Sequence, residues 1–134
     1  MTSSVLIEVG VGELIDKISI LEIKLSHLCD ETKRAHVSYE LSSLVSVKDR
    51  SVTMSSGLKD LAAQLHAKNA SLWQLEERIR AFERRGVFGP EFIAIARSIY
   101  HTNDERAALK RRINILCRSR VVEEKSYDDP SVVK

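Results

Sequence analysis

The sequence is poor in the residues that interrupt helices or build sheets and cross-linked folds. Among 134 residues, five are Gly and two are Pro, and aromatic residues make up 5%. This composition argues against a sandwich or barrel and is typical of long, surface-exposed helices. The only cysteines, Cys29 and Cys117, belong to no CxxC motif or Cys/His cluster. We expect two reduced thiols, with no zinc site, no other metal and no cofactor.

Long apolar runs and strong net charge are also missing. The first nine residues contain no basic region and only a very short apolar run, so they predict no signal peptide. No run is long enough to span a membrane. The net charge of +2 is too small to indicate nucleic acid as a partner. We therefore expect a single cytoplasmic domain over residues 1–120 and an acidic, partly disordered tail over residues 121–134.

What the sequence does contain is three stretches in which apolar residues recur every three or four positions. The first begins at Leu14, the second at Leu58 and the third at Phe92. Such spacing predicts amphipathic helices, over about 12–44, 58–85 and 90–117. Ser55 or Ser56 is a candidate N-cap for the second of them. We predict an all-α fold: an elongated antiparallel three-helix bundle of long, coiled-coil-like helices. A short extended arm over residues 5–9 is expected to precede it and to pack on the bundle.

The clearest predicted boundary lies between the second and third helices. Gly86 is well placed to end the second helix, and Gly89 precedes Pro90 at the start of the third. Because the connection is only a few residues long, the two helices must be antiparallel neighbours.

Polar residues interrupt these stretches at a shared level. Counted from a layer of Leu14, Phe82 and Phe92 at the tight turn, the interruptions fall at neighbouring heights: Thr32, Lys68, Thr102 and Arg106. Two cations at one level of a core would repel each other and resist dehydration. Some feature of the fold must therefore compensate them.

Three interpretations of this level remain open. The long side chains could reach water along their apolar stems. They could instead pair with a carboxylate in a structural polar layer, supplied by Asp30, Glu31 or Asp104. The third interpretation is a pocket for an anion or other ligand, with Trp73, Tyr100 and Asn103 beside Lys68 and Arg106.

A local pattern raises a question about the third helix. Residues 102–105 match the S/T-x-x-E capping box, so the helix could end near His101 and restart. The apolar spacing resumes in phase at Leu109, however, and this favours a continuous helix.

Two segments of the chain carry a family resemblance. The first, residues 12–24, reads GELIDKISILEIK. The second runs from Phe92 through the ARSIYHTNDERA segment to EEKSY at residues 123–127, and Leu72-Trp73 lies between them. The chain resembles an uncharacterised bacterial helical family, a domain of unknown function. Its members occur alone or attached to glycosyltransferase or tetratricopeptide modules.

The resemblance implies a context of surface-glycan assembly but no known activity. It also implies a set of polar positions, which overlaps the interrupted level. With Lys68 added from that level, the candidate binding residues for a ligand or partner are Glu13, Asp16, Lys17, Glu22, Lys68, Trp73, Arg97, Tyr100, Asn103, Arg106 and Lys110.

No phosphate-binding loop, nucleophile elbow, HExxH or dinucleotide motif is found in the sequence. We therefore expect a non-catalytic helical interaction module that binds a protein partner or a second copy, and the resemblance implies that it serves surface-polysaccharide or glycosyltransferase machinery. The alternative is a protein that binds a small anionic ligand, or a helical-bundle enzyme. In either case Arg97, Arg106 and Lys110 would bind the anion. A further group of arginines near the tight turn is expected to be a solvated helix end: Arg78, Arg80, Arg84, Arg85 and Arg97.

Overall fold

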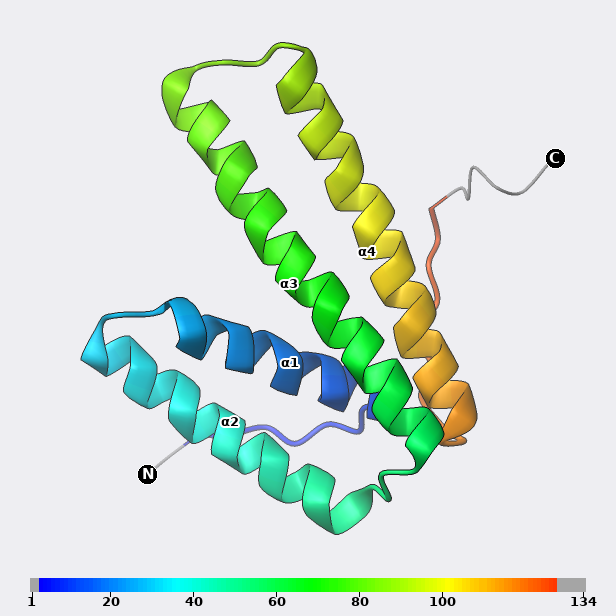
Figure 1. Ribbon diagram of the computed structural model, residues 1–134. Helices are drawn as coiled ribbons and strands as arrows, with labels where there is room; N and C mark the ends of the chain where they lie inside the picture. The colour runs from blue at the N-terminus through cyan, green and yellow to red at the C-terminus, as the bar shows by residue number, and fades with distance from the viewer. Residues whose placement is uncertain (1–2, 128–134) are drawn as a thin grey trace, which may run out of the picture.

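A computed structural model describes residues 3–127, and this part of the chain contains four helices (Figure 1). They are α1 (Val11–His27), α2 (Glu31–Ser51), α3 (Ser56–Arg85) and α4 (Pro90–Leu116). Figure 1 shows two helical hairpins, α1 with α2 and α3 with α4, that diverge from a common end. The predicted all-α class is confirmed, whereas the predicted three-helix bundle is wrong.

The sequence signals for α3 and α4 correspond to real caps. The Ser55 Oγ accepts a hydrogen bond from the Leu58 N–H at 3.2 Å, which satisfies a free donor at the start of α3. Gly86 ends α3 in the left-handed conformation, with φ of 67°. Pro90 occupies the first turn of α4, and α4 continues without a break through the capping-box sequence at residues 102–105. The continuous third helix is therefore confirmed.

The predicted first helix is divided in two. Leu28 adopts an extended conformation, and the Asp30 carboxylate accepts a hydrogen bond from the Lys33 N–H at 2.9 Å, so a new helix starts there. Arg34 donates hydrogen bonds to the carbonyls of Leu25 and Leu28, which satisfies acceptors at the end of α1. These local bonds stabilise a sharp reversal even though the apolar spacing continues through it.

This reversal changes which helices touch. Among the four helices, α2 packs only against α1, whereas α1 also contacts both α3 and α4. No residue of α2 is fully buried, and Tyr39, expected in the first apolar stretch, is 80% exposed. The second half of the predicted first helix therefore packs on the outer side of α1 and contacts neither α3 nor α4.

The core lies at the end of the α3–α4 hairpin opposite its tight turn. Ile15 of α1 packs there against residues from the start of α3 and the end of α4: Leu58, Leu61, Leu65, Leu109 and Ile113. The predicted layer of Leu14, Phe82 and Phe92 is consequently wrong, because α1 never reaches the turn (Figure 1). The spacing of apolar residues defines a face but not the end at which another helix meets it.

Both ends of the described chain run alongside the helices. Residues 3–9 form neither helix nor strand, and Val5, Leu6 and Ile7 are exposed, so this arm does not pack its apolar side chains as expected. Glu8 pairs with Arg120, which lowers the pKa of that carboxyl group. The last seven residues of the predicted tail lie outside the described residues.

Within residues 3–127, none of the helices combines the length and the apolar character needed to cross a bilayer.

Candidate functional site

The most buried charged group of the described chain is the Asp16 carboxylate, which is 1% exposed. It lies on the inner face of α1 and accepts two hydrogen bonds from the Arg106 guanidinium on α4, one of them at 3.0 Å from Nε. The Asn69 amide on α3 donates a third, at 2.9 Å. A buried carboxylate is tolerated only when it is paired and fully hydrogen-bonded, and here two other helices, α3 and α4, supply the partners.

A second ion cluster lies one helical turn further along α4. The Lys110 Nζ donates hydrogen bonds to Glu13 and to Glu123, each at 2.7 Å, and lies 3.8 Å from Asp16. Burial by itself would lower the pKa of Lys110, but the hydrogen bonds from its ammonium to Glu123 and Glu13, together with the negative charges of Glu13 and Asp16, outweigh burial, and the pKa is raised. Lys110 is therefore held as a cation.

The helical register explains why these groups meet. Glu13 and Asp16 are three residues apart on α1, and Arg106 and Lys110 are four apart on α4. Each pair therefore projects from one side of its helix, and the two sides face each other. The pKa of Arg106 is raised mainly by its hydrogen bond to Asp16. These ion pairs therefore hold α1 against α4.

Close backbone packing reinforces this junction. The Gly12 N–H donates a hydrogen bond to Asn114 Oδ1 at 2.8 Å, and the Val11 N–H donates to Ser119 Oγ at 3.1 Å. A Cβ atom at Gly12 would lie 2.5 Å from the Lys110 carbonyl oxygen. The start of α1 therefore approaches α4 at a distance that only glycine permits.

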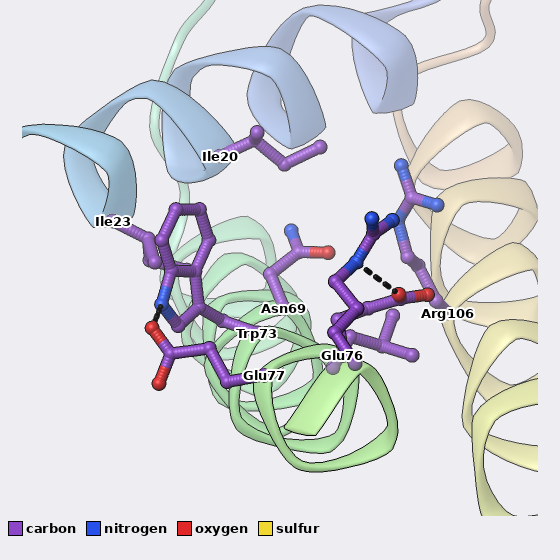
Figure 2. A pocket seen from close by; sticks show the side chains of 9 residues that line it. Ile20, Ile23, Asn69, Trp73, Glu76, Glu77 and Arg106 are labelled. Atoms are coloured by element: carbon purple, nitrogen blue, oxygen red, sulfur yellow. Dashed lines mark hydrogen bonds and ion pairs between the residues drawn. The ribbon is translucent and has the colours of Figure 1, made fainter. Parts of the chain in front are cut away.

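An open groove adjoins the Asp16–Arg106 pair. It has a volume of about 430 Å³, and its walls come from α1 and α3, with Arg106 of α4 at one end. The apolar walls are Ile20, Ile23 and Leu72. Figure 2 shows Trp73 at one side of this groove and Asn69 between Trp73 and Arg106. The groove is thus apolar at its walls and polar at its inner end.

Trp73 is oriented by contacts at both edges of its indole. Its Nε1 donates a hydrogen bond to Glu77 at 2.8 Å, and the His27 ring meets it edge-on with centroids 4.7 Å apart. Glu76 accepts a hydrogen bond from Arg80 at 3.3 Å, and both residues line the groove. A fixed, half-buried tryptophan therefore borders the groove, beside charges of both signs.

A second hollow, of about 550 Å³, opens on the other side of Arg106. Tyr100 and Asn103 of α4 line it together with Lys110, and the chain segment after α4 closes it. In that segment, the Glu123 carboxylate accepts a hydrogen bond from the Lys110 Nζ. The part of this hollow nearest the cations is consequently taken by a carboxylate of the same chain.

Comparison with known proteins identifies the family. A model described as a family of unknown function, DUF6165, matches residues 5–133. The chain belongs to DUF6165. Neither the curated proteins nor the solved structures include a match to it. The expected membership of an uncharacterised family is thereby confirmed.

The predicted site residues of this DUF6165 chain fall into separate groups. Glu13, Asp16, Arg106 and Lys110 form the ion clusters, and Tyr100 and Asn103 line the second hollow. Trp73 borders the groove. The others lie on the surface: Lys17, Glu22, Lys68 and Arg97.

The expected partners of the interrupted level are corrected. Lys68 pairs with Glu105 at the surface, whereas Arg106 pairs with Asp16. Asp30 instead caps α2, and Asp104 pairs with Lys125. Glu31 is exposed in the first turn of α2. Thr32 leaves the predicted level, because it lies on α2, which contacts neither α3 nor α4. Lys68 and Arg106 stay at neighbouring heights, since Lys68 pairs with the residue next to Arg106.

Among the described residues, three buried polar ones were not predicted from the sequence: Ser19, Asn69 and Asn114. Lys68 lies three positions after Leu65, and Asn69 lies four positions after it. The apolar spacing therefore predicts burial equally well for either residue. Asn69 is 5% exposed, whereas Lys68 reaches the surface. The amide is the less costly of the two groups to bury, and this signal was available in the sequence.

Ser19, His66 and Glu22 also come together, but not as a catalytic relay. The Ser19 Oγ and the Glu22 carboxylate both approach the same nitrogen of His66, Nδ1, at 2.8 and 3.8 Å. A relay needs the acid and the hydroxyl on opposite ring nitrogens. Ser19 is also buried and accepts a hydrogen bond from Asn69. In residues 3–127, no group of three or more His, Cys, Asp or Glu side chains is arranged to hold a metal ion.

Proposed function

We propose that this chain is a non-catalytic helical interaction module whose groove between α1 and α3 receives apolar side chains from a helix of a partner protein. The observation that carries the proposal is the open groove of about 430 Å³, walled by Ile20, Ile23 and Leu72 next to Trp73. Tryptophan is enriched among the residues that contribute most to protein interfaces. An amphipathic helix binds in such a groove through apolar side chains spaced three or four positions apart.

The ion clusters support the proposal by holding the groove open. Asp16 and Arg106 fix α1 against α4, and Asn69 ties the same carboxylate to α3. A site formed before binding loses less conformational entropy when the partner arrives. The rim charges at Glu76 and Arg80 would then select orientation more than affinity.

The family resemblance suggests the cellular process in which such a partner takes part. We propose a component of bacterial surface-polysaccharide assembly, such as a glycosyltransferase, encountered in the cytoplasm. A second copy of this chain is the competing occupant, and the experiment below separates the two.

The alternative function, binding of a small anionic ligand by Arg97, Arg106 and Lys110, has weaker support. Asp16 already neutralises Arg106, and Glu13 with Glu123 neutralise Lys110. Arg97 lines neither the groove nor the second hollow. An external anion would have to displace a carboxylate of the same chain.

The test compares wild type with Ile20→Glu, which places a charge in the groove wall, and with Tyr39→Glu, which adds the same charge at an exposed residue of α2. Light scattering after size exclusion measures self-association, and affinity purification measures bound proteins. Because Trp73 is the single tryptophan, its emission reports occupancy of the groove directly.

The proposal expects wild type and Tyr39→Glu to bind the same protein, and Ile20→Glu to bind it at least about tenfold more weakly. Dimers lost in the same variant would identify a second copy as the occupant. A monomeric wild type that retains no protein sensitive to Ile20→Glu would contradict the proposal. Sugar nucleotides or carboxylic acids that raise the melting temperature would favour the alternative.

A further inference from the structure

The tight turn between α3 and α4 is the part of the molecule most distant from its core. In Figure 1 this end of the hairpin projects away from α1 and α2, which pack at the other end. The exposed fractions there are high for apolar residues: 46% for Val87, 54% for Phe88 and 55% for Ile93. An apolar tip that no other element covers needs a physical explanation.

The side chains of this tip are held in place. Gly86 reverses the chain in a left-handed conformation, and the Phe88 ring packs edge-on against Phe92 with centroids 5.2 Å apart. The Arg85 guanidinium lies 4.6 Å from the centre of the Phe82 ring. The apolar groups are therefore presented by an ordered turn at the end of two rigid helices.

Positive charge surrounds the same turn. Between residues 78 and 97 the chain carries five arginines and two acids, Glu83 and Glu91. Arg78 pairs with Glu91 at 3.8 Å and Arg80 pairs with Glu76. Within residues 3–127, Arg84, Arg85 and Arg97 make no ion pair. These three guanidinium groups are free to meet an anionic partner.

A shallow hollow of about 450 Å³ joins the two features. It is lined by Arg78 and Arg85 together with Phe82, Val87 and Glu91, next to the exposed Phe88. Cationic groups beside aliphatic and aromatic side chains match the boundary between lipid headgroups and acyl chains.

We infer that the tip of the α3–α4 hairpin, residues 84–93, docks on the surface of an anionic lipid bilayer. Val87 and Phe88 enter the interfacial region, and Arg84 and Arg85 contact the headgroups. Charge alone would also suit nucleic acid, but exposed aliphatic groups at Val87 and Ile93 favour lipid over stacked bases. This surface is separate from the groove at Trp73, so neither proposal depends on the other.

Vesicle sedimentation tests the inference with the full chain. The vesicles are phosphatidylcholine alone, or phosphatidylcholine with about one third phosphatidylglycerol. Wild type should bind the anionic vesicles at least about tenfold more than the neutral ones, and added salt should weaken binding because exposed charges are screened. A duplex DNA probe is measured under the same conditions.

Two double variants locate the contact. Arg84→Glu with Arg85→Glu, and Val87→Ser with Phe88→Ser, should each lower binding at least about tenfold. The matched control, Lys59→Glu with Arg112→Glu, makes the same change in net charge at the other end of the hairpin and should retain binding. Circular dichroism checks that all variants fold.

Three results would overturn the inference. They are a wild type that ignores anionic vesicles, tip variants that bind as well as the charge-matched control, and DNA binding through the arginines without vesicle binding.

Discussion

Asp16 on α1 and Arg106 on α4 form a bidentate ion pair between residues 90 positions apart in sequence. Asn69 of α3 binds the same carboxylate, so one buried group joins three helices. Because α2 packs only on α1, this junction also fixes where the whole α1–α2 hairpin sits on the α3–α4 hairpin. The shape of the groove beside Trp73 follows from it.

Arg106→Ala should lower the free energy of unfolding by about 3–5 kcal/mol, because it leaves the Asp16 carboxylate buried without its cation. Urea denaturation measures the change. Arg97→Ala, at an exposed arginine of the same helix, is the control and should cost less than about 0.5 kcal/mol. If Arg106→Ala cost no more than this control, the pair would not be holding the helices together.

Gly12→Ala and Gly57→Ala should have different effects although both add one methyl group. The new Cβ at Gly12 would lie 2.5 Å from the Lys110 carbonyl oxygen, which is backbone and cannot move freely. We expect a loss of about 1–3 kcal/mol in thermal or urea unfolding. At Gly57 the nearest atom is 3.6 Å away, so the helical preference of Ala should leave stability unchanged or slightly higher. Equal losses at both positions would argue against the close approach of α1 to α4.

Leu65→Ala and Leu72→Ala separate the core from the groove. Leu65 is fully buried among α1 and α4 residues and should cost about 2–5 kcal/mol when truncated. Leu72 lines the open groove and should cost clearly less, because part of its surface is already in contact with water. Chemical denaturation measures the loss in free energy of unfolding for both variants. A larger loss for Leu72→Ala than for Leu65→Ala would show that the groove wall belongs to the core.

The two cysteines should differ in reactivity towards a thiol reagent at neutral pH. Burial raises the pKa of the Cys117 thiol, which packs against the core, whereas Cys29 is exposed. A raised pKa leaves less thiolate, the reactive form, and burial also limits access. We expect Cys29 to react first, with Cys29→Ser removing the fast phase and Cys117→Ser removing the slow one. A fast phase that survives Cys29→Ser would show that Cys117 opens readily to solvent.

The sequence predicted the second hairpin well because its signals are local. Ser55 caps α3, Gly86 ends it and Pro90 opens α4, and each acts through bonds or dihedral angles within a few residues. The reversal at Leu28 was missed even though Asp30 followed by Glu31 is a recognisable helix start. The apolar spacing continues from Leu28 through Thr32 and Ala35, and it concealed the break.

The sequence pointed to the residues of the ion clusters but not to how they pair, and it did not predict the apolar walls of the groove. The candidate residues that the sequence offers include Glu13, Asp16, Arg106 and Lys110, yet the acids that it offers to Arg106 are Asp30, Glu31 and Asp104. Helical spacing shows which residues share a face of one helix. It carries no information on which acid of another helix lies opposite.

The sequence by itself thus determined that this chain is helical, where α3 and α4 begin and end, and which polar residues stand among apolar ones. Caps, turns and periodicity act over one or two helical turns, so they can be read along the chain. Only the tertiary structure decided that α1 meets the end of α3–α4 far from the turn, and that Asp16 receives Arg106. Those choices depend on packing and on pairing a buried charge across 90 positions, and the interactions that settle them exist only once the helices have come together.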